Sequence, residues 1–130
     1  MRLSLLRHYI EPPIALGQFR IFHIDAVPRA AVTWGFLSPE VERKMIEGVP
    51  LDPDDWHSGD QMWVIDMLAP YRGLTSRIVR WLMVPGNLTQ TNFRYRRVSD
   101  ANTTRRIVHV DFRHRQLARV HDVDSYLVAR

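Results

Sequence analysis

The chain contains no cysteine among its 130 residues. This absence excludes disulfide bonds, thiolate metal ligands and a cysteine nucleophile. The six histidines form neither an HxxxH nor an HExxH spacing, so the sequence predicts no metal site. No apolar run reaches the length of a membrane span, and the first residues lack the pattern of a signal peptide. We therefore expect a soluble, cytoplasmic protein without stable membrane insertion and without a bound cofactor.

The composition is that of one folded domain. With 45% hydrophobic and 25% charged residues, the chain resembles a globular protein, and its length suffices for one core spanning residues 1–130. The formal net charge of +4 is concentrated in arginines that follow Thr91. Such a basic end is typical of a solvated strand face and, less often, of a docking surface for an acidic partner. Both interpretations remain open at this point.

Hydrophobic periodicity and turn residues predict a mixed α/β, or α+β, domain with one central sheet flanked by helices. Pro12 and Pro13 are expected to end the first helix, and the stretch Ser38-Pro39-Glu40 to begin the second. The predicted helices cover residues 3–10, 39–47 and 74–83. The predicted strands cover residues 18–24, 29–37, 62–69, 92–98 and 105–112. The pattern of residues 51–59 predicts a polar loop, and that of residues 115–130 predicts no element.

One acid interrupts the most apolar of these strands, which reads MWVIDML from residue 62. Strict alternation places Asp66 on the same face as Val64 and Leu68, and Trp63, Ile65 and Met67 on the opposite face. An ionised carboxylate is costly to bury unless it gains a partner or a raised pKa. Asp66 is therefore either a structural acid that accepts hydrogen bonds at a strand end, or a functional acid that orients a histidine or acts as a base.

The run D-W-x-S-G-D-x-x-W-x-I-D-x-x-A-P-Y, from Asp55 to Tyr71, resembles the signature of the RTX toxin-activating lysine acyltransferases of the hemolysin C type. The stretches at 12–22 and 27–38 resemble the first two strands of that family. The resemblance implies a GNAT-like mixed sheet. It also implies transfer of a fatty acyl chain from acyl carrier protein, the acyl donor, to lysine ε-amines of an RTX protoxin. Members of the family are often described as dimers.

The resemblance also implies a catalytic pair of a histidine and the aspartate of the motif, here Asp66. The family histidine aligns a few residues upstream of Met1, so we expect that the start of the sequence has been placed too late. Two alternatives remain open. His8 is a stand-in base, or the chain is a catalytically inactive, shortened homologue that binds acyl carrier protein or protoxin.

Further residues are candidates for substrate binding. Trp63, Met67, Trp81 and Met83 are expected to line an apolar groove for the acyl chain. Arg94 and Arg96 are expected to contact the acidic carrier protein. The histidines of the basic end, including His109, are expected to share its solvated face. Nucleic-acid binding by aromatic and arginine side chains of the last hairpin is a weaker alternative, because no RNA-binding motif accompanies them.

Overall fold

The computed structural model describes residues 3–70, 73–99 and 103–129, with side chains from residue 10 onward. Its helices are α1 (Leu3–Leu16), α2 (Pro39–Ile46), the 3-10 helix η1 (Pro53–Trp56), α3 (Leu74–Leu82) and α4 (Val123–Val128). Its strands are β1 (Phe19–Ile24), β2 (Val27–Leu37), β3 (Gln61–Leu68), β4 (Asn92–Val98), β5 (Thr104–Asp111) and β6 (Ala118–Asp122). This is the predicted α+β class, and both predicted hairpins are confirmed.

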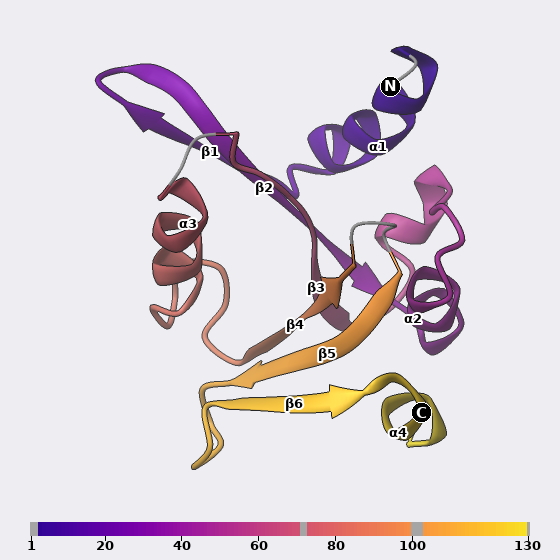
Figure 1. The fold of residues 1–130 in the computed structure, drawn as a ribbon. Helices are drawn as coiled ribbons and strands as arrows, with labels where there is room; N and C mark the ends of the chain where they lie inside the picture. Colours follow the sequence, from indigo (N-terminus) through magenta and orange to yellow (C-terminus); the bar gives the residue numbers. More distant parts are fainter. Residues whose placement is uncertain (1–2, 71–72, 100–102, 130) are drawn as a thin grey trace.

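One sheet holds the described strands in sequence order, and every neighbouring pair is antiparallel except β3 and β4, which are parallel. Helix α3 lies on one side of this sheet, and α2 and α4 lie on the other (Figure 1). We call these sides the α3 face and the α2 face. Ile78 and Phe93 belong to the core on the α3 face, and Trp63 and Ile107 to the core on the α2 face; all four side chains are fully buried.

Helix α1 is longer than predicted. It continues through Pro12 and Pro13 to Leu16, so the predicted stop at the prolines was wrong. A proline removes one backbone hydrogen bond, but its fixed φ is compatible with a helix. Both prolines are buried, and this packing offsets the lost hydrogen bonds. The helix ends instead at Gly17, whose φ of 71° favours glycine.

Helix α2 begins and ends as predicted. The hydroxyl of Ser38 accepts a 3.2 Å hydrogen bond from the backbone N–H of Val41, and Pro39 occupies the first helical turn. Gly48 follows the helix with a φ of 84°. The loop after it is less polar than predicted, since η1 directs Trp56 fully into the core on the α2 face.

Strand β3 contains a β-bulge, an extra residue that the sequence did not reveal. Val64 lies opposite Trp34, and Asp66 lies opposite Thr33, so Ile65 has no position of its own in the ladder. Directly opposed residues share a face of the sheet, and a one-residue insertion reverses the alternation beyond it. Ile65 accordingly packs on the α2 face, whereas Met67 packs on the α3 face. The predicted grouping of Ile65 with Met67, and of Asp66 with Val64, was therefore wrong.

The end of the chain forms β6 and α4, for which the sequence predicted no element. The carboxylate of Asp122 accepts a 2.7 Å hydrogen bond from the N–H of Ser125 and so caps α4. Tyr126 of this short helix is buried in the core on the α2 face. No helix in the described ranges is long and apolar enough to cross a membrane.

Candidate functional site

A cavity of about 280 Å³ lies where β3 and β4 meet. The two strands run parallel and pair at Trp63 and Arg94. Beyond this pair, both strands and α3 contribute to the cavity wall. Its apolar lining includes Val64, Met67, Val79, Leu82, Met83 and Phe93. Asp66 and Arg96 bring an acidic and a basic group to the same cavity. An apolar pocket with a few polar groups that converge on it is the usual form of a ligand site.

Asp66 lies half-buried on the wall of this cavity. Its backbone N–H donates a 3.2 Å hydrogen bond to Oγ1 of Thr33 on the neighbouring strand. Burial raises the pKa of the Asp66 carboxyl above its ordinary value, and the positive charge of Arg96 opposes this rise. A carboxylate with a raised pKa is a stronger base than an exposed one, which suits acid-base chemistry.

Arg96 is held in place by two neighbouring elements. Its Nη1 donates to Oγ1 of Thr104 on β5 at 3.0 Å and to the carbonyl oxygen of Met45 in α2 at 3.5 Å. The structure therefore brings together two of the residues that the sequence singled out, Asp66 and Arg96, at one cavity.

Trp63 does not reach the cavity. Its side chain is fully buried on the α2 face, where Nε1 donates a 2.8 Å hydrogen bond to Oε2 of Glu42. Among the other groove candidates, Met67 and Met83 line the cavity, whereas Trp81 packs edge-on against Phe22 with ring centroids 5.4 Å apart. The lining of this cavity thus shares Met67 and Met83 with the predicted groove but not the two tryptophans.

Glu42 is a buried acid that sequence analysis missed. Its side chain is 1% exposed, and the same oxygen accepts hydrogen bonds from Trp63 Nε1 and from the Tyr126 hydroxyl. The residue stands among charged neighbours in α2, so no local pattern distinguishes it from an exposed glutamate.

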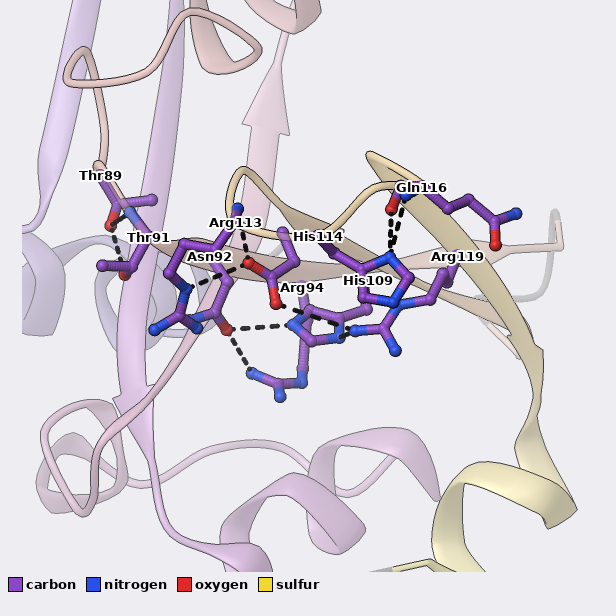
Figure 2. Close-up of polar contacts among 10 residues, drawn as sticks. Thr89, Thr91, Asn92, Arg94, His109, Arg113, His114, Gln116 and Arg119 are labelled. Carbon is purple, nitrogen blue, oxygen red and sulfur yellow. Dashed lines mark hydrogen bonds and ion pairs between the residues drawn. The ribbon is translucent and has the colours of Figure 1, made fainter.

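Part of the basic end is buried rather than solvated. Arg94 is only 7% exposed, and its Nη1 donates to Oδ1 of Asn92 at 3.3 Å. The same oxygen lies 3.0 Å from Nε2 of His109, and Arg119 approaches this ring from β6 (Figure 2). The prediction of a solvated face was therefore wrong for Arg94. His109 is half-buried, and Arg106 and Arg113 are exposed.

The protonation of His109 follows from its neighbours. Nη2 of Arg119 lies 3.1 Å from Nδ1 of His109. Because a guanidinium only donates, Nδ1 accepts this bond and Nε2 carries the proton that is donated to Asn92. Burial, together with the charges of Arg94 and Arg119, lowers the pKa of His109 to about 4. The ring is therefore neutral at neutral pH.

The remaining histidines lie apart from Asp66 or outside the described side chains. His8 belongs to α1, but its side chain is not among those described. His57 is exposed after η1, and its Nδ1 lies 3.2 Å from Oε1 of Gln18. His23 is exposed on β1. In the described part of the chain, no histidine lines the cavity.

The sequence matches a family model described as the RTX toxin acyltransferase family over residues 1–111. The chain belongs to this family. The match includes β3 with Asp66 and β4 with Arg96, and therefore covers both charged residues of the cavity. Strand β6 and helix α4 follow the matched segment.

Several curated proteins are similar to part of the chain. The leukotoxin-activating lysine-acyltransferase LtxC of Aggregatibacter actinomycetemcomitans is 46% identical over 70 residues, which cover 53% of this chain and 42% of that protein. The RTX-I toxin-activating lysine-acyltransferase ApxIC of Actinobacillus pleuropneumoniae is 40% identical over 70 residues, or 53% and 41% of the two chains. The protein-lysine myristoyltransferase RtxC of Kingella kingae is 39% identical over 70 residues, or 53% and 42%. The matched segment thus spans less than half the length of these relatives.

Proposed function

We propose that the chain is a protein-lysine acyltransferase that modifies an RTX protoxin and takes a fatty acyl chain from acyl carrier protein. The observation that carries this proposal is the position of Asp66 on the wall of an apolar cavity that also contains Arg96. Membership of the RTX toxin acyltransferase family supports it. The printed names of the relatives, which include toxin-activating lysine acyltransferases and a lysine myristoyltransferase, support the same reaction class.

The reaction requires a base close to the thioester, where it can deprotonate the incoming lysine. A free lysine has a pKa of about 10.4 and is protonated near neutral pH. The ammonium group must lose a proton before its nitrogen attacks the thioester carbonyl. The new carbon–nitrogen bond then replaces the carbon–sulfur bond, and the thiol of the carrier leaves with a proton. Asp66 serves this reaction either by accepting the lysine proton or by orienting a histidine that accepts it.

The apolar part of the cavity suits the fatty acyl chain of the donor. Its apolar lining from β3, β4 and α3 provides a surface for a hydrocarbon chain, because burial of apolar groups is favourable by about 0.8 kcal/mol per methylene. With the chain on this lining, the thioester carbonyl lies near Asp66 and Arg96. The exposed arginines on and after β5, such as Arg106 and Arg113, offer a contact surface for the acidic carrier protein.

One observation favours a second candidate function. No histidine lines the cavity in the described residues, so the chain also fits a catalytically inactive homologue that binds acyl carrier protein or protoxin through its exposed arginines. Such a binding module forms a salt-sensitive complex without transferring the acyl chain.

The test combines the purified chain, an acylated carrier protein and an RTX protoxin, and measures lysine acylation by mass spectrometry. We expect Asp66→Asn to lower the transfer rate at least 100-fold, since acid-base catalysis contributes roughly that factor or more. Asp54→Asn, in the exposed η1 segment, is the matched control and retains the rate. Transfer that survives Asp66→Asn contradicts the role of Asp66. Salt-sensitive binding without transfer favours the binding module.

A further inference from the structure

The β-bulge at Ile65 lies directly before Asp66, and two residues of β2 accommodate it. We propose that Thr33 is the positioning residue for Asp66: its hydroxyl fixes the backbone of the bulge and thereby directs the carboxylate toward Arg96 in the cavity. This inference rests on the proposed function and goes beyond it, because it assigns a role to a residue outside the D-W-x-S-G-D motif region. Bulges commonly re-aim a side chain next to an active site.

The backbone N–H of Asp66 is held by a side chain of the neighbouring strand. Beyond the bulge, this N–H donates to the Thr33 side chain at 3.2 Å. Thr33 is only 8% exposed, so water has little access to this position, and leaving the N–H of Asp66 unpaired there is unfavourable. A threonine hydroxyl can accept this hydrogen bond, whereas a valine of the same shape cannot.

The side chain of Ile65 packs close to Gly35 of β2. A Cβ atom at Gly35 would lie 2.8 Å from Cδ1 of Ile65 and 3.1 Å from the carbonyl oxygen of Trp56. The first of these distances is shorter than two carbon atoms tolerate. A side chain at position 35 would force the end of the Ile65 side chain to shift, so Gly35 leaves room for Ile65 to pack on the α2 face. Thr33 and Gly35 flank Trp34 on β2, and each lies against one residue of the Ile65-Asp66 pair.

The register of β3 against β2 determines which face of the sheet Asp66 occupies. Asp66 lies opposite Thr33 and so shares the face of Ile65 and Trp63. Arg94 pairs with Trp63 across the parallel strands, and Arg96 is two positions further along β4 on the same face. Strict alternation without the bulge places Asp66 with Val64 on the α3 face, away from Arg96. The bulge thus determines whether the two charged residues lie on the same face of the sheet.

Two variants test this role. Thr33→Val keeps the shape of the side chain and removes the acceptor, and Thr33→Ser keeps the acceptor. Thr75→Val, on the exposed side of α3, is the matched control. We expect Thr33→Val to speed hydrogen exchange at the Asp66 amide about five- to tenfold and to change the carbon-13 titration curve of its carboxyl. In the acylation assay the same variant lowers kcat about tenfold with KM unchanged, because positioning acts on the reacting group and not on binding. Thr33→Ser restores all three values.

The outcomes separate this inference from the proposed function. Exchange and titration curves that are unchanged in Thr33→Val overturn the role of Thr33, even if acyl transfer is observed. If no acyl transfer is observed for the wild-type chain, the proposed function fails, and the exchange and titration results still decide the role of Thr33. If Thr33→Val does not fold, hydrogen exchange at the Asp66 amide of the wild-type chain tests the proposal instead. Protection of this amide equal to that of the paired amides of β3 supports the role of Thr33. Exchange as fast as in an exposed strand overturns it.

Discussion

The hydroxyl of Tyr126 donates a 2.6 Å hydrogen bond to Oε2 of Glu42, a residue 84 positions earlier in the chain. Nε1 of Trp63 donates to the same oxygen. The Trp63 and Tyr126 rings pack edge-on, with their centroids 5.9 Å apart. A carboxylate that is 1% exposed is tolerated because these donors replace its hydration. The contact attaches α4 to α2 and to the strand that carries Asp66.

Removing the Tyr126 hydroxyl tests this attachment. We expect Tyr126→Phe to lower the free energy of unfolding by about 1–3 kcal/mol, since a hydrogen bond to a charged group contributes roughly that amount. Urea denaturation monitored by tryptophan fluorescence measures the change. Tyr95→Phe is the control, because it removes a hydroxyl from a ring that stacks on Phe93. An equal effect of both substitutions would show that the bond to Glu42 adds no stability.

The half-buried imidazole of His109 makes the stability of the protein depend on pH. Its pKa is lowered from 6.5 to about 4, so the unfolded chain binds a proton more readily than the folded chain between these values. The stability contributed by the neutral ring is therefore complete above pH 6.5 and is lost as the pH falls toward 4. At about 1.4 kcal/mol per pKa unit the full shift corresponds to about 3 kcal/mol. Solvent screens a half-buried ring, so we expect a loss on the order of 2 kcal/mol.

Thermal unfolding of wild type, His109→Gln and His23→Gln between pH 4 and pH 8 measures this dependence. We expect His109→Gln to flatten the decline below pH 6.5, and His23→Gln, at an exposed position of β1, to leave it unchanged. A wild-type melting temperature that is constant over this range contradicts the buried neutral state of His109.

The pH dependence of stability that Asp66 contributes has the opposite sign to that of His109. Its pKa is raised above the ordinary value of 3.8, so the folded state binds the proton more tightly than the unfolded state. Its favourable contribution is fully present below pH 3.8 and is lost as the pH rises through the raised pKa. We expect Asp66→Asn to be more stable than wild type at pH 7 and to lose this advantage near pH 3. Comparing the melting temperatures of the two proteins at both pH values tests the sign, and a variant less stable than wild type at pH 7 contradicts it.

The apolar lining of the cavity predicts selectivity for acyl-chain length. Met83 lies on its wall at the end of α3, so Met83→Trp fills part of the space that the distal methylenes would occupy. We expect transfer of a sixteen-carbon chain to fall more than tenfold relative to an eight-carbon chain. Val84→Trp, at the exposed next position, is the control. An equal effect on both donors would place the acyl chain elsewhere.

Most elements could be predicted from local sequence. The Ser38-Pro39 start and the Gly48 end of α2 follow from capping chemistry, and both hairpins follow from alternation and turn residues. Pro12 and Pro13 gave the wrong helix end because their burial, a tertiary effect, outweighs their helix-breaking tendency. Strand β6 and helix α4 were not predicted because both are too short to show a clear periodicity.

The site was predicted less completely than the fold. The sequence identified Asp66 and Arg96, which the structure brings to one cavity, but it placed Trp63 there as well. The bulge at Ile65 could not be seen in β3 alone, because it depends on the pairing with Thr33 and Gly35 of β2. Likewise, the burial of Arg94 and Glu42 arises from contacts with residues distant in sequence.

Asp66 is a partly desolvated acid, and the positive charge of Arg96 in the same cavity offsets part of the cost of its ionisation. A carbon-13 titration of the Asp66 carboxyl in wild type and in Arg96→Gln measures both effects. We expect a pKa above 3.8 in wild type and a further increase in Arg96→Gln, because the opposing positive charge is removed. An ordinary or lowered pKa in wild type, unchanged by Arg96→Gln, would contradict it.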